Sequence, residues 1–275
     1  MRFLLIGLSL ICVFTSPPTI GSERTAVDLA IVIDDVGYNK QRGLRAISLP
    51  APVTIAILPF APHTQSLAAA TKRVGKDLII HQPMEAIPSP HVRLEEDTLT
   101  TAMTPAQFDS AVTRAIAAVP ESLGFSNHTG SLLTTQREPM QRFMRHLQAR
   151  NLVFLDSRTT ASTVAVQVAD ELGVTALRRD VFLDHERSTH AIEAAFNKAV
   201  RLARNKGHAI LVGHPYPITL SFLEKALASP PEGINLVGLE ALALKRRSLK
   251  HSALRRLEEL ALEPRPENLH ISLGQ

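Results

Sequence analysis

The chain has 275 residues, 45% of them hydrophobic, and a formal net charge of +4 at pH 7. This composition is sufficient for a folded core and excludes a globally disordered chain. From Lys245 onward seven Lys and Arg stand against four Glu, so the rest of the chain is close to neutral. A nucleic-acid-binding protein would carry positive charge along one face of its fold, and we therefore expect no nucleic-acid function.

The first 22 residues have the pattern of a secretory signal peptide. Arg2 precedes a largely apolar stretch, 3–14, which is followed by a Pro-Pro pair. A membrane anchor needs about 20 such residues, so the stretch fits a cleaved signal peptide better. The single cysteine, Cys12, lies inside it, which leaves the mature chain without disulfides or thiolate ligands. We expect a periplasmic or secreted protein.

Strand and helix patterns alternate through the remainder of the chain. Short apolar runs predict strands at 29–33, 53–58, 78–80, 123–126, 152–155, 174–177, 208–212 and 234–237. Apolar residues at helical spacing predict helices between these strands and over 241–262.

Seven or eight strand–helix units without an intervening linker indicate one α/β domain over 27–245. We expect a single (β/α) barrel-like domain of seven to eight parallel strands, complete or imperfect. An open doubly wound sheet is the alternative. Residues 246–275 are expected to form a basic helical tail.

Side chains that can bind a metal or transfer a proton follow the predicted strands. They are Asp34, Asp35, His81, His128, Asp156, Asp180 and His214. In a parallel β/α architecture the carboxyl ends of the strands converge at one mouth, so these side chains are expected to lie near one another. Two or three histidines with a carboxylate are typical ligands of a divalent transition metal, most often Zn²⁺. Such an ion would also neutralise the repulsion between the two adjacent aspartates.

The segments that carry these residues resemble the motifs of the divergent polysaccharide deacetylase family, exported bacterial relatives of the NodB-type carbohydrate esterases. The matching segments are IDDVG at 33–37, HQPME at 81–85, NHTGS at 127–131, LDSR at 155–158, DVFLD at 180–184 and GHP at 213–215. The resemblance runs from about residue 29 to 245. It implies a deacetylase-type barrel that hydrolyses carbon–nitrogen bonds and removes N-acetyl groups from an amino-sugar glycan of the envelope or the extracellular space.

The resemblance implies a role for each matching residue at the metal. Asp34 corresponds to the general base and Asp35 to a metal ligand, and His128 matches the first histidine of the second motif. Typical members have another histidine four residues later, whereas no second histidine follows His128 here. We expect His81, from the preceding strand end, to complete the metal shell.

Two further residues are expected to act on the reacting amide. His214 resembles the late-strand histidine that serves as general acid in the wider family. Asn127, or a nearby backbone N–H, is expected to stabilise the tetrahedral oxyanion.

Two other functions compete with this interpretation. The altered second motif fits a catalytically inactive barrel that binds carbohydrate or an envelope protein. A glycoside hydrolase would instead pair Asp34 with Asp156 or Asp180 and need no metal.

Overall fold

The structure is a computed structural model that describes residues 26–88, 95 and 97–262. The predicted signal peptide (1–22) and the last part of the predicted tail (263–275) lie outside the described residues. Within the described part of the chain, every helix is too short or too polar to cross a membrane.

All the described strands pair in parallel within a single sheet. They are β1 (Val27–Val36), β2 (Thr54–Ile57), β3 (Leu78–Met84), β4 (Gly124–Thr129), β5 (Val153–Asp156), β6 (Ala176–Arg178), β7 (Val181–Phe182), β8 (His208–Gly213) and β9 (Ile234–Val237). The order across the sheet is β6-β5-β4-β3-β2-β1-β8-β7, and β9 pairs with β1. The predicted single (β/α) barrel-like domain is therefore confirmed, and the open doubly wound alternative is not needed.

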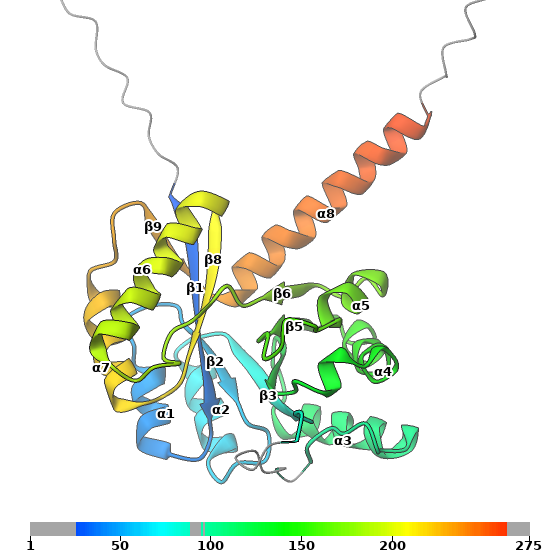
Figure 1. Cartoon of the computed structure of the whole chain (residues 1–275), viewed down its shortest axis with the longest axis horizontal. Helices are drawn as coiled ribbons and strands as arrows, with labels where there is room; N and C mark the ends of the chain where they lie inside the picture. Colours follow the sequence, from blue (N-terminus) through cyan, green and yellow to red (C-terminus); the bar gives the residue numbers. More distant parts are fainter. Residues whose placement is uncertain (1–25, 89–94, 96, 263–275) are drawn as a thin grey trace, which may run out of the picture.

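Helices follow most strands and cover the outside of the sheet (Figure 1). They are α1 (Lys40–Ile47), α2 (Thr64–Arg73), α3 (Pro105–Ala118), α4 (Arg137–Gln148), α5 (Ala165–Glu171), α6 (Thr189–Lys206), α7 (Pro217–Ala228) and α8 (Leu239–Leu262), with a 3₁₀ turn at Leu133–Thr135. Thr104 caps α3 in a full capping box with Gln107, and Pro105 occupies its first position. The larger core cluster lies between these helices and the outer face of the strands.

A second, smaller core fills the inside of the barrel. Because side chains alternate along a strand, Leu29, Ile31 and Ile33 belong to the outer core, whereas Ala30 and Val32 belong to the inner one. The first turns of α8 contribute Leu239, Leu242 and Ala243 to the same inner core. The start of α8 therefore closes the barrel interior, and the rest of the helix projects away from the body (Figure 1).

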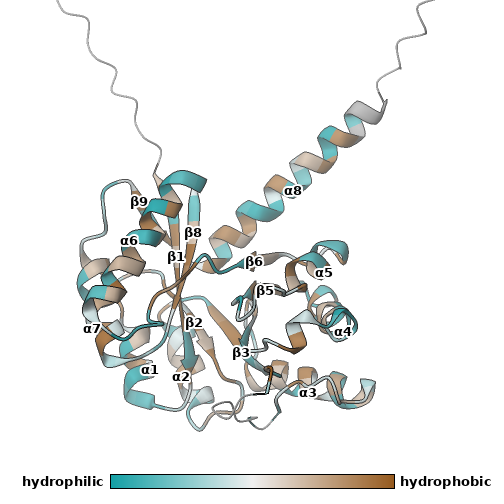
Figure 2. Ribbon diagram, in the orientation of Figure 1, coloured by the Kyte–Doolittle hydropathy of each residue, from teal (hydrophilic) through white to brown (hydrophobic). Residues whose placement is uncertain are grey.

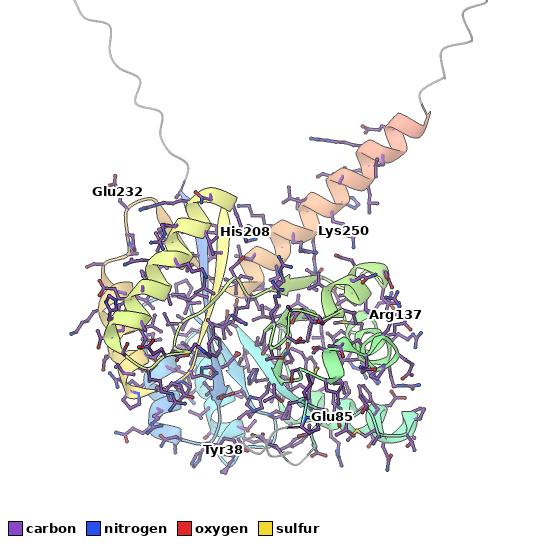
Figure 3. All side chains as sticks on the ribbon, in the orientation of Figure 1. Tyr38, Glu85, Arg137, His208, Glu232 and Lys250 are labelled. Atoms are coloured by element: carbon purple, nitrogen blue, oxygen red, sulfur yellow. The ribbon has the colours of Figure 1, made fainter. Side chains whose placement is uncertain are left out.

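The two ends of the barrel differ in character. Apolar strands run through the middle of the molecule in Figure 2. Tyr38 and Glu85, which follow the carboxyl ends of β1 and β3, lie at the end opposite His208, the first residue of β8 (Figure 3). The strand ends that carry Asp34, Asp35, His81, His128 and His214 lie at the end of Tyr38 and Glu85, as expected for a parallel barrel.

The structure departs from the predicted elements in several places. β1 continues to Val36, so Asp34 and Asp35 lie within it. β3 and β4 continue to Met84 and Thr129, so His81 and His128 lie within strands rather than after them. β7 was missed, because a two-residue strand leaves no pattern in the sequence. α8 runs without a break across the predicted boundary between residues 245 and 246.

The sheet does not close between β6 and β7. These consecutive strands are the two ends of the pairing order of the described strands, and only Arg179 and Asp180 separate them. The barrel is therefore imperfect, with its seam next to the mouth.

Candidate metal and acid–base site

Strand alternation directs the candidate side chains into the barrel mouth. Val32, Ile79 and Val212 all belong to the inner core. Two residues further along, their strands carry Asp34, His81 and His214, which therefore share the inner face. The same alternation places Ser157 two residues beyond Leu155 and Arg179 two residues beyond Leu177.

Asp35 reaches the mouth in a different way. A regular strand would turn this side chain to the face opposite Asp34. Instead, Asp35 has a φ of +57°, and the register of the β1–β2 pairing shifts between Ile33 and Val36. The left-handed backbone is uncommon for a residue other than Gly, and here it turns the second carboxylate back toward the site.

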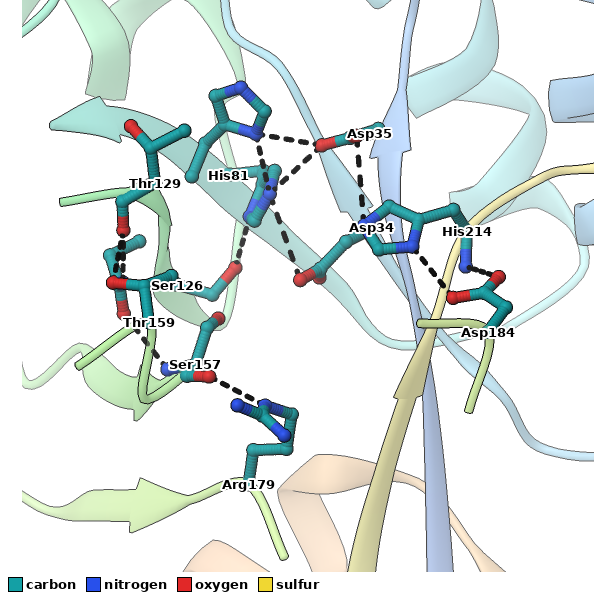
Figure 4. A network of polar contacts seen from close by, with 12 residues as sticks. Asp34, Asp35, His81, Ser126, Thr129, Ser157, Thr159, Arg179, Asp184 and His214 are labelled. Atoms are coloured by element: carbon teal, nitrogen blue, oxygen red, sulfur yellow. Dashed lines mark hydrogen bonds and ion pairs between the residues drawn. The ribbon is translucent and has the colours of Figure 1, made fainter. Parts of the chain in front are cut away.

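One carboxylate oxygen and two imidazole nitrogens converge at the centre of the site (Figure 4). Asp35 Oδ1 lies 2.8 Å from His128 Nδ1 and 3.1 Å from His81 Nε2. The two nitrogens are 3.2 Å apart. One ligand atom from each of the three residues fits within 4.8 Å of the others. Asp34 lies alongside, with its Oδ2 at 3.7 Å from His81 Nε2.

The donor set fits a divalent cation. Asp35 Oδ1 and Asp34 Oδ1 are both buried, and neither has a hydrogen-bond partner among the described residues. His81 Nδ1 lies 2.7 Å from Ser126 Oγ, a contact that leaves Nε2 to face the carboxylate oxygen. A lone pair facing a carboxylate is repelled unless a proton or a cation lies between them. The set of one carboxylate and two imidazoles is typical of Zn²⁺ and related ions.

His128 has a carboxylate on its far side as well. Its Nε2 lies 3.6 Å from Glu95 Oε1, in the connection between β3 and α3. Carboxylates often orient metal-binding histidines through the nitrogen that does not face the metal. Glu95 is therefore placed to orient the ring of His128.

His214 faces the centre from the opposite side and is held by Asp184. Its Nδ1 lies 2.9 Å from Asp184 Oδ1, and its backbone N–H donates to Asp184 Oδ2 at 2.7 Å. Thr219 Oγ1 donates to the same Oδ2 at 2.8 Å. The free nitrogen, Nε2, points toward Asp35 Oδ2 at 3.7 Å (Figure 4). The arrangement fixes the ring and leaves Nε2 available for proton transfer.

The surroundings shift the pKa values of these groups in opposite directions. Burial raises the pKa of Asp34, and the nearby histidines only partly counter this. Burial also works against ionised Asp35, but the close approach of His128 and His81 outweighs it and holds the pKa of Asp35 far below its usual range. Burial lowers the pKa of His214, yet the contact with Asp184 and the charge of Asp35 outweigh it and raise this pKa. Asp34 is therefore the better proton acceptor of the two aspartates. The raised pKa of His214 favours its protonated form, which can donate a proton.

Asn127 supports the loop beside the site. Its Nδ2 donates to the carbonyl of Thr129 at 2.7 Å, and its Oδ1 accepts the backbone N–H of Ser157 at 2.8 Å. The amide thus bridges the ends of β4 and β5 and lines the cavity at the mouth. Its expected contact with an oxyanion stays a prediction.

The structure places Asp156 and Asp180 away from the central carboxylates. Asp156 accepts the backbone N–H of Arg158 and the hydroxyl of Thr163. Asp180 pairs with Lys206 at 2.8 Å and accepts a backbone N–H. Both carboxylates are committed to structural contacts, so the pairing that the glycoside hydrolase alternative requires is not formed.

Sequence reasoning missed the role of Asp184. The residue lies in the DVFLD segment, but 30 positions separate it from His214. Only the parallel pairing of β7 with β8 brings the two side chains together. The sequence shows only an acidic residue two positions after the apolar pair Val181-Phe182. This pattern is too common to indicate a functional residue.

A cavity of about 390 Å³ opens beside the central residues. Asp34, His81, His128 and His214 line one part of it. Ser157, Arg158, Arg179 and Phe182 line another part. The site therefore combines a candidate metal centre with room for a small polar group such as one sugar ring.

Comparison with known proteins identifies the family of the chain. The family model for divergent polysaccharide deacetylases matches residues 31–243. An uncharacterized protein of Haemophilus influenzae is 38% identical over 211 residues, covering 77% of this chain and 75% of that protein. The chain belongs to the divergent polysaccharide deacetylase family.

Solved structures show the same fold. An uncharacterized protein of Agrobacterium tumefaciens has a TM-score of 0.76 at 24% identity, covering 81% of this chain and 91% of that one. The peptidoglycan deacetylase PdaC of Bacillus subtilis has a TM-score of 0.50 at 12% identity, covering 86% and 98%. At these identities the likeness concerns the fold, a barrel that a peptidoglycan deacetylase also uses.

Proposed function

We propose that the protein is a metal-dependent hydrolase that removes N-acetyl groups from an amino-sugar glycan. The observation that carries the proposal is the convergence of Asp35, His81 and His128 beside Asp34, with His214 on the other side. Membership of the deacetylase family supports the reaction class.

Asp35, His81 and His128 would hold the metal, for which we propose Zn²⁺. Typical deacetylases carry two histidines in the second motif, and here β3 supplies His81 in place of the second one. When bound, such an ion supplies Lewis-acid polarisation of an acyl group and lowers the pKa of water. Asp35 Oδ1 supports this assignment because it is buried, makes no hydrogen bond of good geometry, and faces the two imidazole nitrogens at 2.8 and 3.1 Å.

The remaining roles belong to the side chains of the chain itself. Asp34 takes a proton from the attacking water, because it is the carboxylate beside the metal that is not engaged as a ligand. His214 Nε2 gives a proton to the leaving amine nitrogen, while Asp184 keeps the ring oriented and stabilises its charged form. Asn127 is proposed to contact the oxyanion from the cavity wall.

We further propose that the protein acts outside the cytoplasm. Support comes from the signal-peptide pattern of residues 1–22. The substrate would then be a glycan of the envelope or the extracellular space.

The test is acetate release from N-acetylglucosamine oligomers and peptidoglycan fragments. The mature chain is stripped of metal with a chelator and assayed before and after the addition of one equivalent of Zn²⁺. We expect turnover only with metal. Asp34→Asn should bind the metal and lose turnover by about 10²-fold or more, the usual contribution of a general base.

Asp180→Asn is the matched control, since this carboxylate follows β6 and binds Lys206 outside the cavity. It should retain turnover. Metal binding without acetate release on any N-acetylated sugar would overturn the hydrolytic proposal and favour a carbohydrate-binding or protein-binding barrel.

A further inference from the structure

We propose that the wall of the cavity formed by Ser157, Arg158 and Arg179 is a subsite for an anionic substituent of the substrate, a carboxylate or a phosphate. The amino-sugar substrate is taken from the proposed function. The subsite adds a selectivity for acidic over neutral acetylated sugars.

The loop after β5 is built to hold Ser157 and Arg158 in place. The backbone N–H of Ser157 is bound by Asn127 Oδ1, and that of Arg158 by Asp156 Oδ1, both at 2.8 Å. Arg158 has a left-handed backbone with a φ of +48°. Uncommon backbone conformations of this kind cluster at ligand-binding sites, and Arg158 lines the cavity.

Arg179 fixes the same loop from the other side. Its Nε donates to the carbonyl of Ser157 at 2.5 Å (Figure 4). Its Nη2 donates to the carbonyl of Arg158 at 2.9 Å. The guanidinium lies 5.0 Å from the centre of the Phe182 ring. These contacts hold the guanidinium against the cavity wall and leave Nη1 without a protein acceptor among the described residues.

Within the described residues the two arginines of this wall form no ion pair, although the charges of Asp34, Asp156 and Asp180 act on Arg179 from further away. Within the described part of the chain, neither Arg158 nor Arg179 lies within 4.0 Å of a carboxylate oxygen, although most other buried or half-buried charges near the site are paired. Two guanidinium groups on one wall repel each other unless an anion joins them. Guanidinium groups favour carboxylates and phosphates, to which they donate two bonds at once.

Ser157 provides an independent sign that a ligand binds here. The residue is only 6% exposed and lines the cavity, yet its Oγ has no hydrogen-bond partner in the described structure. A buried hydroxyl without a partner is costly, and an oxyanion in the cavity would accept its proton. The hydroxyl of Ser157 and the two guanidinium groups line the same cavity and together supply donors for one anionic group.

The charges of the cavity also set the orientation of the substrate. Arg158 and Arg179 attract an anionic group to their part of the cavity lining, which is separate from the residues that would hold the metal. An acidic amino sugar would therefore enter with its anionic group on the arginine wall and its acetamide toward Asp34.

The experiment compares equilibrium binding of three sugars to the full mature chain by calorimetry. N-acetylmuramic acid, N-acetylglucosamine and N-acetylglucosamine 6-phosphate share the acetamide and differ in an added carboxylate or phosphate. The wild type should bind at least one acidic sugar about tenfold or more tightly than the neutral one, the effect of a charged hydrogen bond. The carboxylate and phosphate arms identify which anion is preferred.

Arg158→Asn should reduce this preference to about threefold or less, whereas Arg158→Lys should retain part of it. Asn is chosen because it tolerates the left-handed backbone. Arg178→Asn is the matched control, because this neighbouring arginine is exposed and lies outside the cavity lining. The control should keep the full preference.

Equal affinity of the wild type for all three sugars, absence of binding, or an unchanged preference in Arg158→Asn would overturn the subsite. These outcomes are separate from catalysis, because binding is measured without turnover. Acetate release with no acidic preference would refute the subsite alone. An acidic preference without acetate release on any substrate would refute the hydrolytic function alone.

Discussion

Addition of Zn²⁺ to the metal-free protein is expected to raise its melting temperature, and His81→Ala is expected to abolish the rise. A ligand at one hundred times its Kd stabilises the folded state by about 2.7 kcal/mol. In a domain of this size, 1 kcal/mol corresponds to about 2–4 °C. The expected increase for the wild type is therefore about 5–10 °C.

The substitution has two effects that the assay must separate. His81 is 2% exposed and lies 2.7 Å from Ser126 Oγ. Its removal therefore costs about 1–3 kcal/mol of stability even without metal. The informative quantity is the increment that Zn²⁺ produces in each variant. The chain contains no Trp, so unfolding is followed by circular dichroism.

His146→Ala provides the matched control, since this histidine lies on α4 and pairs with Asp109 at 2.9 Å. It should keep the whole increment, and His128→Ala should lose it like His81→Ala. An increment in His81→Ala equal to that of the wild type would refute the proposed ligand set. No increment in any form of the protein would refute the metal site itself.

Three other outcomes follow from the structure. Asp184→Asn should lower kcat for acetate release by about 10²-fold. The alkaline limb of the pH profile of kcat should also shift to lower pH, because His214 loses the contact that raises its pKa. An unshifted limb would contradict this role of Asp184. Burial raises the pKa of Asp156 above 3.8, so its protonated form adds stability below that pH, which is lost as the pH rises through the folded pKa. Asp156→Asn should therefore be more stable than the wild type at pH 7 and equal to it below pH 3.8 in chemical denaturation, whereas a constant difference would exclude this origin. Phe143→Ala, which removes a fully buried ring on α4, should lower the free energy of unfolding by about 3–5 kcal/mol, and a loss below about 1 kcal/mol would show that the core is not packed as described.

The parallel barrel could be predicted because its determinants are local. The run Leu29–Ile33 is buried on both faces, so it is apolar throughout and ends sharply at Asp34. Every predicted strand of this kind is present in the structure. β7 could not be predicted, since its two residues are held by pairing with β8 and not by their own pattern.

The composition of the site could be inferred in part for a similar reason. Strand ends converge in any parallel barrel, so the sequence predicts that His81, His128 and Asp35 lie together, as they do in the structure. Successive side chains of a strand point to opposite faces, and this decides which strand-end residues face the barrel interior. Ser157 therefore lines the cavity, whereas its neighbour Asp156 does not. Uncertain strand boundaries make that parity difficult to predict from sequence.

Asp184 and the arginine wall depended on tertiary structure. The bond from Asp184 to His214 links the β7–α6 connection to the end of β8. The arginine wall combines Arg158, after β5, with Arg179, in the seam between β6 and β7. Neither residue stands in a sequence pattern typical of an anion site, so their common role appears only once the loop contacts are known.

The position of β1 in the sheet has a consequence for how the chain folds. β1 is the first strand, yet it pairs with β8 and β9, so that Asp28 lies opposite His208 and Asn235. The interior is then closed by Leu239, Leu242 and Ala243 at the start of the last helix. Contacts between such distant parts of a chain make folding slow, because a large loop must close before they form. The fold therefore cannot be completed until residues near 243 are available. A chain shortened before that point would expose the inner core of the barrel instead of forming a smaller barrel.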